Sequence, residues 1–183
     1  MKRLCLAIAI LGAALAPAVA QGASASSFSL TLTGSDGPND IRIAISGDRS
    51  EYVISANGPI GAILSCKNPP DDPHQLRCPM SQISGFTVRG RGGNDSLSVG
   101  EAVMVSVFGY GGDGFDDLSG GANSDKLAGG PGADELRGGD GADYLYGGLG
   151  DDRLRGGGGN DVLRGGLGTD QLFGGPGRDD EIE

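Results

Sequence analysis

A nine-residue phrase repeats without interruption from Gly111 to the C-terminus. It reads GGxGxDxLx, and each of its eight copies begins nine residues after the previous one. The copies start at Gly111, Gly120, Gly129, Gly138, Gly147, Gly156, Gly165 and Gly174. Position six is aspartate in every copy, and position eight is leucine in all but the last. A fixed period of this length indicates a solenoid, in which each repeat stacks on its neighbours.

The composition agrees with a repeat protein and not with an ordinary globular core. Glycine accounts for 37 of 183 residues, aromatic residues for 5%, and tryptophan is absent. Glycine at this level without a period is typical of disorder, and with a period of three it is typical of collagen. A glycine-rich linker with incidental aspartates is also excluded, because the aspartate and leucine offsets are constant.

Each position of the phrase has a structural interpretation. Glycines at positions one, two and four permit a positive φ or a close approach of backbones, and Asn123, at position four of its copy, is the next most tolerant residue type. Positions seven to nine predict a three-residue strand whose central leucine points inward, while flanking residues such as Arg153 and Arg155 point outward. The inward leucines are Leu97, Leu118, Leu127, Leu136, Leu145, Leu154, Leu163 and Leu172.

The aspartates at position six predict a cation site. Coils of a parallel β-solenoid lie about 4.8 Å apart, and two carboxylates at that spacing repel by roughly 3 kcal/mol at an effective dielectric constant near 20. A divalent cation between stacked aspartates removes the repulsion, and carbonyl groups of the turns complete an oxygen shell. Oxygen ligands favour calcium over zinc or copper, and magnesium demands a tighter octahedron.

The phrase, above all GGLGDDRLR from Gly147, resembles the haemolysin-type calcium-binding repeat of RTX proteins. The resemblance covers Gly111 to Ile182, and more loosely GRGGNDSLS from Gly90 to Ser98. It implies a parallel β-roll with two nonapeptides per coil and calcium between turns on the same edge. Carried over by position, the expected metal ligands are Asp95 and two ladders, namely Asp116, Asp134, Asp152 and Asp170, and Asp125, Asp143, Asp161 and Asp179. Each ladder of four has three gaps, which predicts up to six interior calcium ions.

Charge and core size indicate that this region folds on binding calcium. Residues 111–183 contain 16 acidic and six basic residues, a net charge of −10 that six divalent ions would nearly cancel. One inward leucine per nine residues makes a thin core, so we expect metal binding and folding to be coupled. In the last copy Glu181 replaces the leucine, which predicts a polar cap and leaves the metal role of Asp179 open.

The first twenty residues predict a secretory signal peptide. Lys2 and Arg3 precede an apolar run from Leu4 to Leu15, and Ala18-Val19-Ala20 forms a small-x-small cleavage site. The run is too short for a comfortable membrane anchor. Residues 21–27 are a polar linker, and the mature protein is expected to be secreted, extracellular and without a membrane span.

Removal of the signal peptide leaves two cysteines, Cys66 and Cys78, on either side of the polar loop Lys67 to Arg77. In an exported chain they most simply form one disulfide. A metal site that uses both cysteines and His74 is the alternative, but its spacing lacks a second ligand pair.

Residues 28–110 predict a β-rich region without helical periodicity. Strands are expected at 28–32, 41–45, 51–55, 60–64, 86–88 and 103–107, where apolar residues alternate or β-formers cluster. The turn PNDIRI resembles the repeat around Asp40, but Ile41 and Ile43 then fall one position out of phase with the leucines. The expected fold class is therefore all-β, a parallel β-roll over 111–183 preceded by a β-rich region with a degenerate repeat at 90–98.

Charge and motif content exclude several functions. The net charge is −10, and about −12 without the signal peptide, which argues against nucleic acid and anionic membranes as partners. The chain has one histidine and neither G-x-S-x-G nor H-E-x-x-H, so no enzymatic activity is expected.

A secreted calcium-binding protein is the expected function. One alternative is a cell-surface structural or adhesive protein with a calcium-rigidified rod and an extracellular or cell-envelope protein partner. The other is the non-catalytic part of a secreted hydrolase or toxin-like protein. For the adhesive alternative, the outward apolar residues are Tyr144, Tyr146, Val162 and Phe173. Tyr144 and Val162, two repeats apart, are expected to be neighbours that form a small contact patch.

Overall fold

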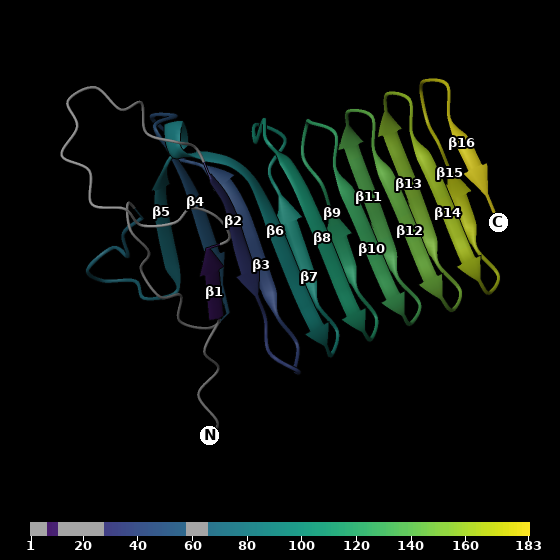
Figure 1. Cartoon of the computed structure of the whole chain (residues 1–183), viewed down its shortest axis with the longest axis horizontal. Coiled ribbons are helices and arrows are strands. Elements are labelled where there is room, and N and C mark those ends of the chain that lie inside the picture. The colour runs from purple at the N-terminus through teal and green to yellow at the C-terminus, as the bar shows by residue number, and fades with distance from the viewer. Residues whose placement is uncertain (1–6, 11–27, 58–65) are drawn as a thin grey trace.

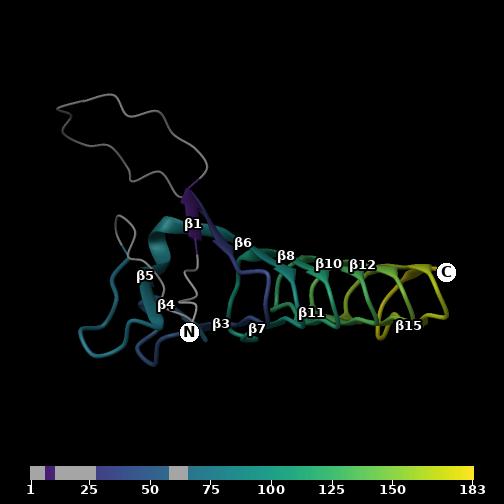
Figure 2. The ribbon, with the colours of Figure 1, turned by 90° about the horizontal axis from the view of Figure 1, so that it is seen from below.

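Two eight-stranded β-sheets lie face to face and run along the molecule from one end to the other (Figures 1 and 2). The computed structural model describes residues 7–10, 28–57 and 66–183. Within these ranges the one helical element is a 3-10 turn, η1, at Met80–Gln82. The predicted all-β solenoid is confirmed, because consecutive strands along the repeats alternate between the two sheets and pair in parallel with the strand after next.

The first sheet has the order β1-β2-β6-β8-β10-β12-β14-β16. Its strands are β1 (Ala7–Ile10), β2 (Phe28–Thr33), β6 (Ile83–Gly92), β8 (Ser106–Asp113), β10 (Lys126–Pro131), β12 (Tyr144–Leu149), β14 (Val162–Leu167) and β16 (Asp180–Ile182). The second has the order β15-β13-β11-β9-β7-β3-β4-β5. Its strands are β15 (Gln171–Phe173), β13 (Arg153–Gly158), β11 (Glu135–Asp140), β9 (Asp117–Ser119), β7 (Ser96–Val99), β3 (Asp40–Ile45), β4 (Glu51–Ala56) and β5 (Gln75–Pro79).

Two nonapeptides form each coil, as the resemblance implies. Tyr144 pairs with Val162, eighteen residues later, and Leu145 pairs with Leu163. The repeat leucines fill the space between the sheets, and those from Leu118 to Leu163 are at most 2% exposed. Leu172, in the last complete coil, is partly buried against them. The predicted inward column of leucines is therefore confirmed.

In most copies the repeat strand is longer than the three residues that the sequence predicts. β12 begins at Tyr144 and continues through Gly147 and Gly148 to Leu149. Gly148 still pairs with Gly166 of the next coil. Without side chains, the glycine backbones approach closely enough for pairing to continue into the turn. β9, β15 and β16 keep the predicted length of three residues.

At the N-terminal end, β4 and β5 extend the second sheet in antiparallel fashion beyond β3. A disulfide joins Cys66 to Cys78 of β5, and backbone pairing between Lys67 and Arg77 accompanies it. The expectation of a loop from Lys67 to Arg77 was thus wrong at its C-terminal part. The reason is tertiary, since Tyr52 of β4 pairs with Cys78.

Two further strand predictions differ in outcome. The strand expected at 103–107 is wrong at its start, because β8 begins at Ser106 while Val103 is buried in the preceding turn and donates its N–H to the carbonyl of Gly100. The strand expected at 60–64 lies outside the described residues.

The predicted signal peptide also lies outside the described residues, apart from β1, which pairs antiparallel with β2. In the described part of the chain no helix is long and apolar enough to cross a membrane.

Candidate metal centre

The structure brings the position-six aspartates together in two rows, one on each edge of the solenoid. In each row the backbone N–H of one aspartate donates to Oδ1 of the equivalent aspartate one coil later. The N–H of Asp116 lies 2.8 Å from Oδ1 of Asp134, and the N–H of Asp134 lies 2.8 Å from Oδ1 of Asp152. The same contact joins Asp95 to Asp116, Asp152 to Asp170, Asp125 to Asp143, Asp143 to Asp161, and Asp161 to Asp179.

These carboxylates are buried, and in most of them one of the two oxygen atoms lacks a hydrogen-bond partner among the described residues. The seven aspartates from Asp95 to Asp161 in the two rows are between 1% and 6% exposed. The Oδ2 atoms of six of them have no hydrogen-bond partner among the described residues, and these are Asp95, Asp116, Asp134, Asp143, Asp152 and Asp161. A buried, unpartnered carboxylate oxygen is costly, so each one indicates a missing positive partner.

The glycine at position one makes room for this arrangement. A Cβ on Gly129 would lie 2.1 Å from Oδ2 of Asp134, and Gly138 has the same relation to Asp143 at 2.2 Å. Any larger residue would force the carboxylate out of the row. The repeated glycine therefore allows the aspartate side chain to fold back beneath its own turn.

Burial changes the acidity of the rows. It raises the pKa of Asp134 and of Asp143 to about 7, and that of Asp116 and of Asp152 to about 6. Neighbouring carboxylates contribute to these raised pKa values through their negative charge, while the backbone N–H donors partly oppose the rise. Burial also raises the pKa of Asp161. The charged form of each ladder is thus disfavoured when no cation is bound.

Asp125 differs from the other buried aspartates. Its Oδ1 accepts the N–H of Val107, and its Oδ2 accepts the N–H of Gly121. The left-handed conformation expected for Asn123 is wrong, because neither Asn123 nor Gly121 has a positive φ. Instead, the Asn123 amide donates to the carbonyl of Met104. This turn supplies the Oδ2 atom of its aspartate with an N–H donor, which the other buried row aspartates lack among the described residues.

The C-terminal end of the rows is more open. Asp170 and Asp179 are half-buried and not enclosed. Glu181 occupies the position of a core leucine, pairs with Leu163, and accepts the N–H of Gly174 through its side chain. Glu181 thus closes the last turn with a hydrogen bond, as expected of a polar cap.

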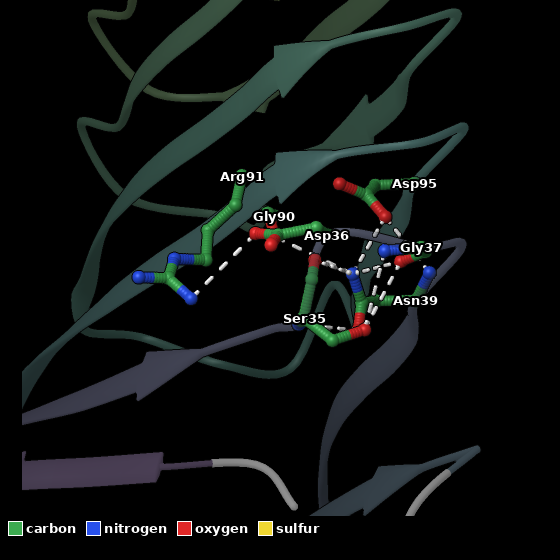
Figure 3. Close-up of polar contacts among 7 residues, drawn as sticks. All are labelled: Ser35, Asp36, Gly37, Asn39, Gly90, Arg91 and Asp95. Atoms are coloured by element: carbon green, nitrogen blue, oxygen red, sulfur yellow. Dashed lines mark hydrogen bonds and ion pairs between the residues drawn. The ribbon is translucent and has the colours of Figure 1, made fainter. Parts of the chain in front are cut away.

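One residue of the first row was missed from the sequence. The phrase PNDIRI is in phase with the repeats after all, because Ile41 pairs with Leu97 and Asn39, not Asp40, stands at position six. The N–H of Asn39 lies 2.8 Å from Oδ1 of Asp95 (Figure 3). The signal was present in the spacing, since Gly34, Gly37, Asn39 and Ile41 stand at positions one, four, six and eight.

The residues of the rows fit a hard cation. Among the described residues no group of three or more His, Cys, Asp or Glu side chains is placed to hold a metal ion. The rows instead offer pairs of carboxylates, so a metal would take its other ligands from the carbonyl oxygens of the turns. Such an all-oxygen set suits calcium, and the unpartnered Oδ2 atoms are acceptors that the ion would satisfy.

Comparison with known proteins agrees with this geometry. Residues 110–145 and 146–180 match the family model described as RTX calcium-binding nonapeptide repeat (4 copies). No curated protein and no solved structure matches the chain. The matched residues form the regular coils, with their parallel strands, inward leucines and buried aspartates. From residue 110 to residue 180 the chain therefore consists of RTX calcium-binding nonapeptide repeats folded as a β-roll.

Proposed function

We propose that this protein is secreted and that its repeats fold when the position-six aspartates bind calcium between stacked turns. The observation that carries the proposal is the set of six buried Oδ2 atoms without a hydrogen-bond partner in the described residues. Secretion rests on the predicted signal peptide in residues 1–20 and agrees with millimolar extracellular calcium, which suits the weak affinities of extracellular calcium modules, about 0.1 to 1 mM.

Folding on binding follows from the contents of the interior. Without a cation, closing the β-roll brings ionised carboxylates out of water and next to one another, which opposes folding. The leucine column cannot offset this cost, since each nonapeptide contributes one inward leucine. With calcium bound, the same carboxylates gain a favourable interaction with the ion, so the free energy of binding contributes to the free energy of folding.

The proposed ligands are those with an unmet oxygen or an open place in a row. They are Asp116, Asp134, Asp152 and Asp170 in one row and Asp143, Asp161 and Asp179 in the other. Asp95 would extend the first row. Asp125 is the weakest candidate, because protein N–H groups already satisfy both of its oxygens. The three gaps from Asp116 to Asp170, the two gaps from Asp143 to Asp179 and the gap between Asp95 and Asp116 accommodate up to six interior ions.

Calcium stoichiometry tests this proposal most directly. Native mass spectrometry and calorimetry on the purified mature chain should count about six ions at saturation, whereas one or none would reject the two-row arrangement. Circular dichroism should show a gain in β-structure when millimolar calcium replaces chelator. Identical β-rich spectra in the two conditions would refute folding on binding.

A matched pair of variants identifies the ligands. Asp143→Asn removes a charge from a buried row, whereas Asp140→Asn makes the same chemical change at an exposed residue three positions earlier. The Asp143 variant should bind fewer ions and need more calcium to fold. The Asp140 variant should behave like the parent chain, and equal effects of the two changes would contradict the assignment.

A non-catalytic role fits the groups available. The single histidine, His74, lies exposed beside Pro73, and the paired acids of the rows are engaged with backbone N–H groups. We propose that calcium serves structure in this protein and not chemistry.

One observation favours a second candidate function, that of a calcium-stabilised rod that binds a partner. A hollow of about 360 Å³ lies on the outer face of the first sheet, between Tyr110 and Tyr146 and above Ala128. Its lining is completed by Tyr144, Lys126, Leu127 and Arg164. The Arg164 guanidinium lies over the Tyr144 ring, 5.7 Å from the ring centre. Outward tyrosines beside basic groups are typical of contact surfaces.

Pull-down from a cell-envelope fraction tests the rod function. The parent chain and a Tyr110→Ala, Tyr146→Ala double variant should be compared, each with calcium and with chelator. A partner that is retained by the parent in calcium alone, and lost in the double variant, supports the rod. Absence of any calcium-dependent partner favours a plain calcium-stabilised module.

A further inference from the structure

The first rung of the row that contains Asp95 is built differently from all later rungs. Here the residue one coil earlier is Asn39, which is 3% exposed and belongs to the turn between β2 and β3. As with the repeat aspartates, its side chain folds back under its own first glycine, and a Cβ on Gly34 would lie 2.6 Å from the amide carbon. Asn39 thus holds the place of an aspartate.

Its amide nitrogen lies within hydrogen-bonding distance of four oxygen atoms (Figure 3). Nδ2 lies 2.8 Å from Oδ1 of Asp95 and 2.7 Å from the carbonyl oxygen of Gly37. The carbonyl oxygens of Ser35 and Gly90 follow at 3.2 and 3.3 Å. Oδ1 of Asn39 instead accepts the N–H of Ser35 at 3.0 Å. Exchanging the amide oxygen and nitrogen would place an acceptor against four acceptors, so the network fixes the orientation of the amide.

Three of these four oxygens are backbone carbonyls, two from the turn before β3 and one from Gly90 near the end of β6, and the fourth is a ladder carboxylate. This is the same class of donor set that the aspartate rows offer to calcium. At the later rungs an aspartate occupies the position that Asn39 occupies here, and its carboxylate brings another acceptor and no donor. Asn39 brings a partially positive NH₂ group to the same place in the turn.

We infer that the Asn39 amide stands in for the cation at the first rung, so that this coil closes without metal and acts as the template on which the calcium-dependent coils fold. The inference rests on the proposed function for the later rungs. It also agrees with the surroundings of Asn39. The disulfide between Cys66 and Cys78, the antiparallel strands β3 to β5 and the contact of Tyr52 with Phe86, 5.2 Å between ring centres, stabilise this end without metal.

A template matters because the first coil is the costly one to form. Each coil closes a loop of about eighteen residues and gains its pairing only when a neighbouring strand is in place. A preformed β7 offers its edge to β9 and fixes the register of the next coil through the pairing of Leu97 with Leu118. Folding would then proceed from Asp95 towards the C-terminus as ions bind.

Hydrogen–deuterium exchange of the purified mature chain in chelator tests the template directly. Peptides from residues 28–57 and 83–98 should be protected in chelator, and peptides from 117–182 should exchange quickly until calcium is added. Fast exchange of both regions in chelator would overturn the inference. Failure of the parent chain to bind calcium would instead reject the proposed function, so the two failures are distinguishable.

Substitution of Asn39 tests the role of the amide. In the Asn39→Asp variant, residues 34–42 and 90–98 should lose their exchange protection in chelator and regain it in calcium. Native mass spectrometry should show that this variant binds one ion more than the parent chain. Asn39→Ala keeps the backbone N–H donor but removes the amide, so calcium should not restore its protection. Asn160→Asp is the matched control, because Asn160 is exposed and uses its Oδ1 only as an acceptor from Arg178. An Asn39→Asp variant with parent-like exchange in chelator and no additional ion would refute the assignment.

Discussion

Residues 28–110 and residues 111–183 contribute strands to the same two sheets but bury different side chains. The first region buries varied apolar groups, among them Phe86, Tyr52, Ile54 and Leu76, together with a disulfide. The second buries six leucines, Leu118, Leu127, Leu136, Leu145, Leu154 and Leu163, and also six aspartates, Asp116, Asp125, Asp134, Asp143, Asp152 and Asp161. One buried carboxylate therefore accompanies each buried leucine in the repeats.

This difference indicates that two regions with the same architecture can depend on different sources of stability. Fully burying a leucine side chain contributes about 1.5 to 3 kcal/mol, and an unpaired buried polar group costs about as much or more. The two terms roughly cancel in the repeats, which supports the proposal that a bound cation stabilises them. In the first region most of the buried groups are apolar, and Asn39 donates to Oδ1 of Asp95, so the deficit in the described part of this region is confined to Oδ2 of that one carboxylate.

The largest expected effect comes from adding one methyl group to a repeat turn. Gly132 has a φ of +153°, and its Cβ would lie 1.5 Å from the carbonyl oxygen of Gly114 on the previous coil. Gly132→Ala should therefore prevent neighbouring coils from stacking and destabilise the calcium-loaded roll by about 4 kcal/mol or more. Calcium titration followed by circular dichroism should show a much smaller gain of β-structure than in the parent chain.

The control for that prediction lies in the other region. A Cβ on Gly47 would meet nothing within 4 Å, so Gly47→Ala should change stability by no more than about 0.5 kcal/mol. If Gly132→Ala were tolerated as well as Gly47→Ala, the close stacking of the turns would be wrong.

The second prediction concerns the disulfide. Replacing both Cys66 and Cys78 by alanine removes a cross-link twelve residues apart in sequence and should cost the first region about 3 kcal/mol. The loss should appear in chelator and in calcium alike, as a lower melting temperature of the region that stays folded in chelator. The number of ions bound at saturating calcium should not change. A lower ion count in the folded variant would mean that the two regions are not separable in this way.

The third prediction compares two aspartates within the second row. Asp125 accepts two protein N–H groups, whereas Oδ2 of Asp161 has no partner in the described chain. Asp125→Asn should lose a hydrogen bond and about 1 to 3 kcal/mol at unchanged ion count. Asp161→Asn should lower the ion count and raise the calcium concentration needed for folding. Native mass spectrometry of both variants distinguishes them, and equal ion loss would remove the distinction drawn for Asp125.

The regular part of this structure could be predicted from the sequence because its period is visible in the residues themselves. The constant offset of Leu145 from Leu163 implies the coil length, and that of Asp143 from Asp161 implies the row. Where the repeat is less regular, the pairing of strands that are far apart in the sequence determines the structure. No single stretch of sequence reveals this pairing. The partner of β5, for example, is β4, whose paired residues stand twenty or more positions earlier in the chain.

Asn39 and Asn123 illustrate the two kinds of error. At Asn39 the adjacent Asp40 led to an alignment one position out of phase. The spacing from Gly34 could have corrected it, and the pairing of Ile41 with Leu97 shows the true phase. At Asn123 the residue type suggested a left-handed turn, but contacts with Met104 and between Gly121 and Asp125 hold another conformation. In both cases a side-chain amide makes contacts that its residue type alone does not specify.

The last prediction concerns pH. Without calcium, burial and neighbouring charges raise the pKa of Asp134 and of Asp143 to about 7, from 3.8 in the unfolded chain. Between these two pH values the folded repeats bind more protons than the unfolded chain, so their stability falls as the pH rises from about 4 to about 7. In chelator, lowering the pH from 8 to 5 should therefore increase the β-structure of the repeats, measured by circular dichroism.

With calcium present the dependence should reverse. Protons and calcium compete for the same carboxylates, so acidification from pH 7 to pH 5 should raise the calcium concentration needed for folding. The first region provides the internal control, since its exchange protection in chelator should change less over this range than that of the repeats. A β-structure signal in chelator that grows as the pH rises would mean that the buried carboxylates are not what prevents the metal-free repeats from folding.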